Sequence, residues 1–349
     1  MWQAPSLEHL VALTDETGLL QHALRDIPKR EYGYCTDDVA RGFIVACGAA
    51  AHNRLRSEAV RLGRIYLSFL HDSQLPDGRF HNFMSYDRRW LDEVGTEDSI
   101  GRAIWSLGVG VRNAPRTAWR EICNEMLERA VPVVRDLSYL RALAYAALGL
   151  SEAYKIPGSP RSAFATALRD IGSRLAAAHA AARGDGWEWF EPAMTYDNAR
   201  LPEALLRIGG ALEDGDLVAL GLRTLDFYES VVIEDGVLVP IGNAGWYRRG
   251  GHRARYGQQP LEAAAIVDAA LVAHALTGEI RYRRLAELSL EWFYGRNTRN
   301  VVMASGGGSY DGLDELAVNR NMGAESTLAH LSSALALAQS GAEILRIAR

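Results

Sequence analysis

Acidic residues recur at the starts of segments that have the pattern of helices. Seven such acids stand just before or within the first turn of stretches rich in Ala, Leu and Gly: Asp37, Asp38, Glu97, Asp98, Asp197, Glu262 and Glu325. One acid in such a place is explained by capping of backbone N–H groups, worth about 0.3–2 kcal/mol. So many helix starts of this kind, two with adjacent carboxylates, offer more acid than capping needs. If the starts converge, they form a carboxylate-lined pocket.

Arginines follow three of these acids by one helical turn: Asp37 is followed by Arg41, Asp98 by Arg102 and Asp197 by Arg200. Acid and arginine then share a helix face. An ion pair on a solvated face is the simpler explanation. These helices have little polar surface, however, and buried ion pairs are costly to keep for stability alone. We therefore expect the three pairs to face a central pocket for a polar ligand.

Aromatic residues surround the same starts. Tyr34 precedes Asp37, and Trp187 and Trp189 lie in the Gly-rich segment GDGWEW rather than on a helical stripe. Aromatic rings usually indicate core. Flat rings beside carboxylates also hold sugars, since C–H faces stack on rings while hydroxyls bond to acids, amides and arginines. We favour sugar contact over core packing for Trp187 and Trp189.

A glycosidase needs two carboxyl groups that flank the bond, one protonated and one acting as base or nucleophile. We expect this pair among Asp98, Asp197 and Glu262, because aromatic-rich or Gly-rich loops precede the last two and Glu97 can raise the pKa of the first. A structural role is an equal alternative for His81. The residues expected to bind substrate are Tyr34, Asp37, Asp38, Arg41, His81, Glu97, Arg102, Trp187, Trp189, Asn198, Arg200, Gln259 and Glu325.

Neither a metal nor a cofactor is expected. The nine histidines form no HxH or HExxH group, the three cysteines form no CxxC pair, and no GxGxxG motif or P-loop follows a strand pattern. A net charge of −5 gives no general affinity for nucleic acid or anionic membrane. The first five residues have no signal-peptide pattern, and apolar runs such as 142–150 are too short to span a bilayer. We expect a cytoplasmic protein.

Two kinds of helical segment alternate along the chain. Six are small and apolar all round, with starts near 36, 97, 137, 196, 258 and 324. Between them lie amphipathic segments, at 6–13, 54–70, 119–133, 161–178, 217–231 and 281–293. A helix that is apolar all round is buried, and an amphipathic one covers it. The pattern predicts an all-α protein with six inner and six outer helices, an (α/α)6 toroid forming one domain over residues 1–349. A short hairpin at 231–239 and an extended segment at 79–86 add a little β-structure.

Four of these segments also resemble the motifs of a known family. They are GYCTDDVAR (33–41), EDSIGR (97–102), TYDNARLPEALL (195–206) and NMGAESTL (321–328). Together they resemble a bacterial family of the six-hairpin glycosidase superfamily, whose members often occur fused to, or encoded beside, family 4 glycosyltransferases. The resemblance runs from Leu7 to about Leu337 and departs from the motif at Val39, where Asn is expected. It implies an (α/α)6 barrel, a carbohydrate site and a glycosyltransferase encoded nearby as partner, but no particular substrate.

The leading hypothesis is a glycoside hydrolase acting on an oligosaccharide, with inversion favoured. A sugar epimerase or isomerase on the same scaffold is an alternative, although such enzymes use histidine bases and no inner-helix start here carries a histidine. A lyase or a phosphorylase is not indicated, while Arg41, Arg102 and Arg200 leave a charged substrate open. A non-catalytic module that binds glycan for a glycosyltransferase also stays open, because fold does not imply function.

Overall fold

The computed structural model describes residues 4–158 and 160–347, with side chains up to residue 340. Residues 1–3, part of the segment in which we expected no signal peptide, lie outside this range. Helices make up 57% of the chain, so the prediction of an all-α protein is confirmed.

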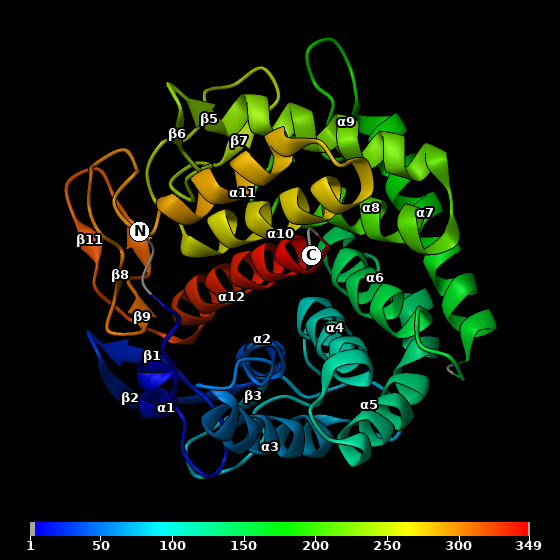
Figure 1. The fold of residues 1–349 in the computed structure, drawn as a ribbon, viewed down its shortest axis with the longest axis vertical. Coiled ribbons are helices and arrows are strands. Elements are labelled where there is room, and N and C mark those ends of the chain that lie inside the picture. Colours follow the sequence, from blue (N-terminus) through cyan, green and yellow to red (C-terminus); the bar gives the residue numbers. More distant parts are fainter. Residues whose placement is uncertain (1–3, 159, 348–349) are drawn as a thin grey trace.

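Six helices form a closed inner ring: α2 (Thr36–Ala49), α4 (Glu97–Asn113), α6 (Leu140–Tyr154), α8 (Arg200–Leu212), α10 (Pro260–Thr277) and α12 (Ala324–Ile347). Each packs against the next, and α12 returns to α2 (Figure 1). They are buried on nearly every side, as in α6, where all residues from Arg141 to Ala153 are buried. The inner helices begin within about four residues of the places predicted from the sequence.

The outer helices cover this ring: α1 (Glu8–Leu13), α3 (Arg56–Ser73), α5 (Thr117–Ala130), α7 (Arg161–Ala182), α9 (Gly215–Val232) and α11 (Ile280–Glu291). Five outer helices each pack on the inner helix that precedes them in the sequence: α3, α5, α7, α9 and α11. The sixth, α1, packs on α12. A 3-10 segment (Val131–Asp136) follows α5. The alternation of inner and outer helices in Figure 1 is the predicted (α/α)6 toroid.

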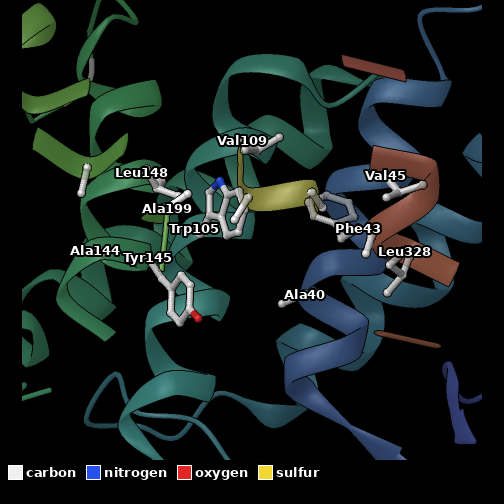
Figure 2. Close-up of a cluster of buried hydrophobic side chains, with 14 of the residues drawn as sticks. Ala40, Phe43, Val45, Trp105, Val109, Ala144, Tyr145, Leu148, Ala199 and Leu328 are labelled. Atoms are coloured by element: carbon white, nitrogen blue, oxygen red, sulfur yellow. The ribbon is translucent and has the colours of Figure 1, made fainter. Parts of the chain in front are cut away.

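Helices α4 and α6 meet with their backbones in contact. A Cβ atom added to Gly108 would lie 2.0 Å from the carbonyl oxygen of Gly149, and one added to Gly101 would lie 2.5 Å from that of Ala142. Only a hydrogen atom fits at these positions. Inside the ring, larger side chains turn toward one another, among them Phe43 and Trp105 (Figure 2).

The longest strands lead into the first inner helix. Strands β1 (Leu20–Leu24), β2 (Ile27–Cys35) and β3 (Phe83–Met84) form an antiparallel sheet in the order β1-β2-β3, and α2 follows β2 directly. The sequence pattern did not predict the β1–β2 pair. It did predict the hairpin of β5 (Ile233–Glu234) and β6 (Val237–Leu238), in which Glu234 pairs with Val237.

Three further strand pairs join loops: β4 (Ala193–Met194) with β7 (Tyr247–Arg248), β8 (Ala304–Ser305) with β9 (Gly308–Ser309), and β10 (Gly312–Leu313) with β11 (Val318–Asn319). Among the described helices, α10 alone is long and apolar enough to cross a membrane, judged by length and composition. It is an inner-ring helix with most of its residues buried. The three cysteines are free and buried.

Candidate active site

The starts of the inner helices meet at one end of the ring, which we call the mouth. Hydrogen bonds join the starts to one another. Arg102 of α4 binds Asp37 of α2, and Arg41 of α2 binds Glu325 of α12. The backbone N–H of Asp197, three residues before α8, donates to Glu262 of α10. The convergence expected from the sequence is therefore present.

Arg102 links two acids across the mouth. Its Nη1 lies 2.8 Å from both oxygens of Asp37, and its Nη2 donates to Asp197 Oδ2 at 3.2 Å. Tyr145 donates to the same Oδ2 at 2.6 Å. Burial tends to raise the pKa of Asp37, but the Arg102 and Arg41 guanidiniums bring it below its ordinary value. We expected Arg102 to pair with Asp98; it pairs with Asp37 and Asp197 instead, because its long side chain reaches past its own turn.

A second ion-pair group joins α2 to α12. Arg41 donates to Asp38 Oδ1 and to Glu325 Oε2, both at 2.8 Å. Asp38 is buried, whereas the Glu325 side chain is 34% exposed. Burial raises the pKa of Asp38 to about 6 in spite of Arg41. This group places one buried carboxyl and one accessible carboxylate beside the same guanidinium.

Asp98 is half-buried at the mouth. The Tyr196 hydroxyl donates to Asp98 Oδ2 at 2.6 Å. Burial raises the pKa of Asp98, the charge of Asp37 adds to that effect, and the Tyr196 hydrogen bond opposes it. The sequence predicts a raised pKa for Asp98 through Glu97, whereas in the structure burial and Asp37 raise it.

Glu97 is occupied elsewhere. It accepts hydrogen bonds from the Ser138 N–H at 2.6 Å, the Ser138 hydroxyl at 2.7 Å and the Tyr139 N–H at 2.8 Å. These donors lie at the start of α6, so Glu97 satisfies backbone groups that precede the neighbouring helix. Glu97 therefore does not cap its own helix, where the Thr96 side chain accepts from the Ser99 N–H; it links α4 to the segment before α6.

Glu262 supports the turn that presents Asp197. Asp197 has a left-handed backbone conformation, with φ of 48°. Glu262 accepts from the Asp197 N–H, from Asn198 Nδ2 at 3.1 Å and from the Tyr228 hydroxyl at 2.8 Å. Burial and the charge of Asp197 raise the pKa of Glu262 to about 7. Glu262 is 1% exposed and surrounded by donors, so it does not face the mouth as we expected of a catalytic carboxylate.

The aromatic residues chosen from the sequence belong to the core. Trp187 and Trp189 are 2% and 0% exposed. The ring of Trp187 packs edge-on against Tyr247, and its Nε1 donates to the Glu191 carbonyl at 2.8 Å. Tyr34 is also buried and donates to Asp15 at 2.6 Å. The expectation that these rings contact sugar is wrong, because the loops that carry them fold inward.

The remaining predicted polar residues mostly hold loops in place. His81 stacks on Trp90 with 4.8 Å between ring centroids, and its Nδ1 lies 2.8 Å from the Asp92 carbonyl, which fits the structural alternative. Asn198 is fully buried and accepts from the Thr195 N–H at 3.1 Å. Gln259 is half-buried at the position preceding α10.

Beneath the mouth, ion pairs continue along the ring axis. Arg200 Nη1 donates to Glu203 at 2.6 Å and to Asp268 at 2.8 Å. Arg207 then joins Glu203 to Glu152, at 2.7 Å from each. Sequence reasoning missed these acids because they lie away from the helix starts. They could have been recognised as charged residues inside helices that otherwise consist of small, apolar residues.

A cavity of about 360 Å³ follows this axis, within the range of small-molecule sites. Of the predicted residues, Arg41, Asp197 and Arg200 line it, joined by Trp105 and Asp268. The five carboxylates Asp38, Asp98, Asp197, Glu262 and Glu325 were expected to line one pocket; only Asp197 lines this cavity. Asp197 Oδ1 and Arg200 Nε are buried and face one another at 3.4 Å without a hydrogen bond. They form a buried ion pair beside the cavity.

Within the described part of the chain, no group of three or more His, Cys, Asp or Glu side chains is placed to hold a metal ion. That the protein needs neither metal nor cofactor stays a prediction.

No family model and no curated protein matches this sequence. Solved structures do match its fold. Cellobiose 2-epimerase from Bacillus thermoamylovorans superposes with a TM-score of 0.74 at 10% identity, over 97% of this chain and 96% of the other. D-mannose isomerase superposes with a TM-score of 0.73 at 12% identity, over 95% of this chain and 94% of the other. The family 76 α-mannanase from Bacteroides thetaiotaomicron superposes with a TM-score of 0.65 at 11% identity, over 97% of this chain and 95% of the other.

The chain is an (α/α)6 toroid. The three structures named here are a sugar epimerase, a sugar isomerase and a mannanase. At these identities the likeness shows the fold alone.

Proposed function

We propose that this protein hydrolyses a glycosidic bond at the mouth, with Asp98 as the general acid and Asp37 as the second carboxylate. The contrast between these two carboxyl groups carries the proposal. Half-burial raises the pKa of Asp98, while Arg102 and Arg41 lower that of Asp37. Two neighbouring carboxyl groups with pKa values pushed apart are the arrangement that acid–base catalysis requires.

In the proposed reaction, protonated Asp98 donates its proton to the glycosidic oxygen as the bond to the anomeric carbon breaks. A water molecule attacks that carbon and gives a proton to the Asp37 carboxylate, with inversion favoured. Arg102 keeps Asp37 ionised, and Tyr196 orients Asp98 through its 2.6 Å hydrogen bond. Glu262 acts by holding the turn before α8, and Asp197 by anchoring Arg102.

Epimerisation or isomerisation of a sugar is the second candidate. The likeness to cellobiose 2-epimerase and D-mannose isomerase favours it. Against it, the described first turns of the inner helices hold no histidine to move a proton at carbon. A glycan-binding module that assists a glycosyltransferase encoded nearby is a third proposal, and a cytoplasmic location stays a proposal with it.

Incubation with cello- and manno-oligosaccharides in ¹⁸O-labelled water separates the three. Hydrolysis releases two shorter products, of which only the one with the new reducing end takes its anomeric oxygen from the labelled water. Epimerisation gives a product of unchanged size with altered chromatographic mobility. A binding module gives no product.

For the hydrolase, Asp98→Asn should lower kcat by at least about a thousandfold while far-UV circular dichroism stays unchanged. The matched control, Asp72→Asn on the exposed side of α3, should keep the wild-type rate. Hydrolysis by Asp98→Asn at the wild-type rate would rule out this acid.

A further inference from the structure

The exposed aromatic rings of this protein lie on one side. Among the described residues, the most exposed large aromatic side chains are Tyr32 (46% exposed), Phe83 (42%), Tyr86 (45%) and Tyr139 (68%). All four stand in segments that lead into an inner helix: Tyr32 before α2, Phe83 and Tyr86 before α4, and Tyr139 before α6. Exposed apolar groups gathered in one region indicate a binding surface. Here that region is the mouth.

Phe83 lies beside the start of α2. Strand β3, which contains it, pairs Phe83 with Cys35, the residue before α2. The neighbouring Asn82 accepts a hydrogen bond from the Asp37 N–H at 3.3 Å. Phe83 therefore lies near the backbone of Asp37, the residue that carries the proposed second carboxylate.

Tyr139 lies at the start of α6, on the other side of Asp98. Its backbone N–H donates to Glu97 at 2.8 Å, and Glu97 precedes Asp98 in α4. Helix α4 stands between α2 and α6 in the inner ring. Phe83, Asp98 and Tyr139 consequently follow one another across the starts of three consecutive helices.

We infer that Phe83 and Tyr139 are stacking platforms for sugar units on the two sides of Asp98, so that the mouth binds an oligosaccharide chain rather than a single sugar. The inference rests on the proposed role of Asp98. A glycosidic bond has a sugar unit on each side, and each unit offers an apolar C–H face to an exposed ring. Two platforms that flank the acid suit a chain lying across the mouth and cut within its length.

Chain-length dependence of binding tests this inference. The Asp98→Asn protein is titrated by calorimetry with cello- and manno-oligosaccharides of two to six units. Affinity in the series that binds should rise at least about fivefold from two units to four. Phe83→Ala and Tyr139→Ala, each added to Asp98→Asn, should weaken binding of the four-unit chain by about fivefold or more. Tyr139→Phe, which keeps the ring, should retain it.

Ile280→Ala is the control, since Ile280 is 53% exposed at the start of α11, at the other end of the ring. It should bind like the parent. Affinity that is independent of chain length, or unchanged in both alanine variants, would overturn the platforms while leaving the proposed hydrolysis standing. If no chain in either series binds even the wild-type protein, the proposed function and this inference both fail.

Discussion

Replacement of Glu262 by Gln tests how the turn before α8 is held. Burial and the charge of Asp197 raise the pKa of Glu262 from its ordinary 4.5 to about 7. Between those two pH values the folded protein keeps a proton that the unfolded chain has already lost. Raising the pH therefore lowers the free energy of unfolding through this window, and has no further effect through Glu262 above it.

The size of the effect follows from the two pKa values. Each pH unit between them is worth about 1.36 kcal/mol, so Glu262 should cost the protein roughly 3 kcal/mol of stability as the pH rises from 4.5 to about 7. Glutamine does not titrate, so Glu262→Gln lacks this slope. The stability of wild type relative to Glu262→Gln should fall by that amount across the window.

Urea unfolding followed by far-UV circular dichroism, at a series of pH values across the window, measures the difference. Subtracting the variant from wild type removes the contributions of other groups, including Asp38, whose pKa is also raised. Glu121→Gln on the exposed side of α5 is the control and should follow the wild-type curve. A wild-type advantage over Glu262→Gln that stays constant with pH would refute the reasoning, because Glu262 would then titrate alike in the folded and unfolded states.

Three further outcomes are expected. Tyr196→Phe removes a hydrogen bond that lowers the pKa of Asp98, so the alkaline fall in kcat, where the acid loses its proton, should move to higher pH in a pH–rate profile. Gly108→Ala places a methyl group against the Gly149 carbonyl and should lower the free energy of unfolding in urea by about 1–3 kcal/mol or more. Trp189→Phe should lower the free energy of unfolding by about 1–3 kcal/mol and leave oligosaccharide affinity unchanged in calorimetry, because Trp189 is wholly buried. A loss of affinity without a loss of stability would show that Trp189 contacts the sugar.

The ring architecture could be predicted because it depends on local pattern. Ala- and Gly-rich helices such as 140–154 have no solvent-exposed face, whereas their amphipathic neighbours have one. The residue pattern of each helix therefore predicts whether it belongs to the inner or the outer ring. The β1–β2 pair could not be found in this way. Its strand Ile27–Cys35 reads as IPKREYGYC, which is largely polar and shows no clean alternation, with only its last three residues buried.

The convergence of the acidic helix starts could be predicted from the sequence, but their pairings could not. Acids at helix starts show where the mouth is, since the ring brings the starts together. Spacing along one helix could not show that Arg102 reaches Asp37 and Asp197 rather than Asp98, because those contacts cross between helices. The Gly-rich setting of Trp187 suggested an open loop, while burial against Phe227 and Tyr247 is a property of the assembled fold. That the chain forms one domain stays a prediction.

The ion pairs along the ring axis constrain how this protein can evolve. Arg200, Glu203, Arg207 and Glu152 are held in series by hydrogen bonds, and Glu203 is fully buried. Loss of one partner leaves its neighbours charged and uncompensated, at a cost of about 3–5 kcal/mol, whereas replacing a whole group by apolar residues is often neutral. A lineage descending from this sequence is therefore expected to keep these positions unchanged or to exchange them together. The exposed aromatic residues at the mouth can be replaced singly at little cost in stability. Substrate preference can therefore diverge among descendants while the buried ion pairs along the axis are retained.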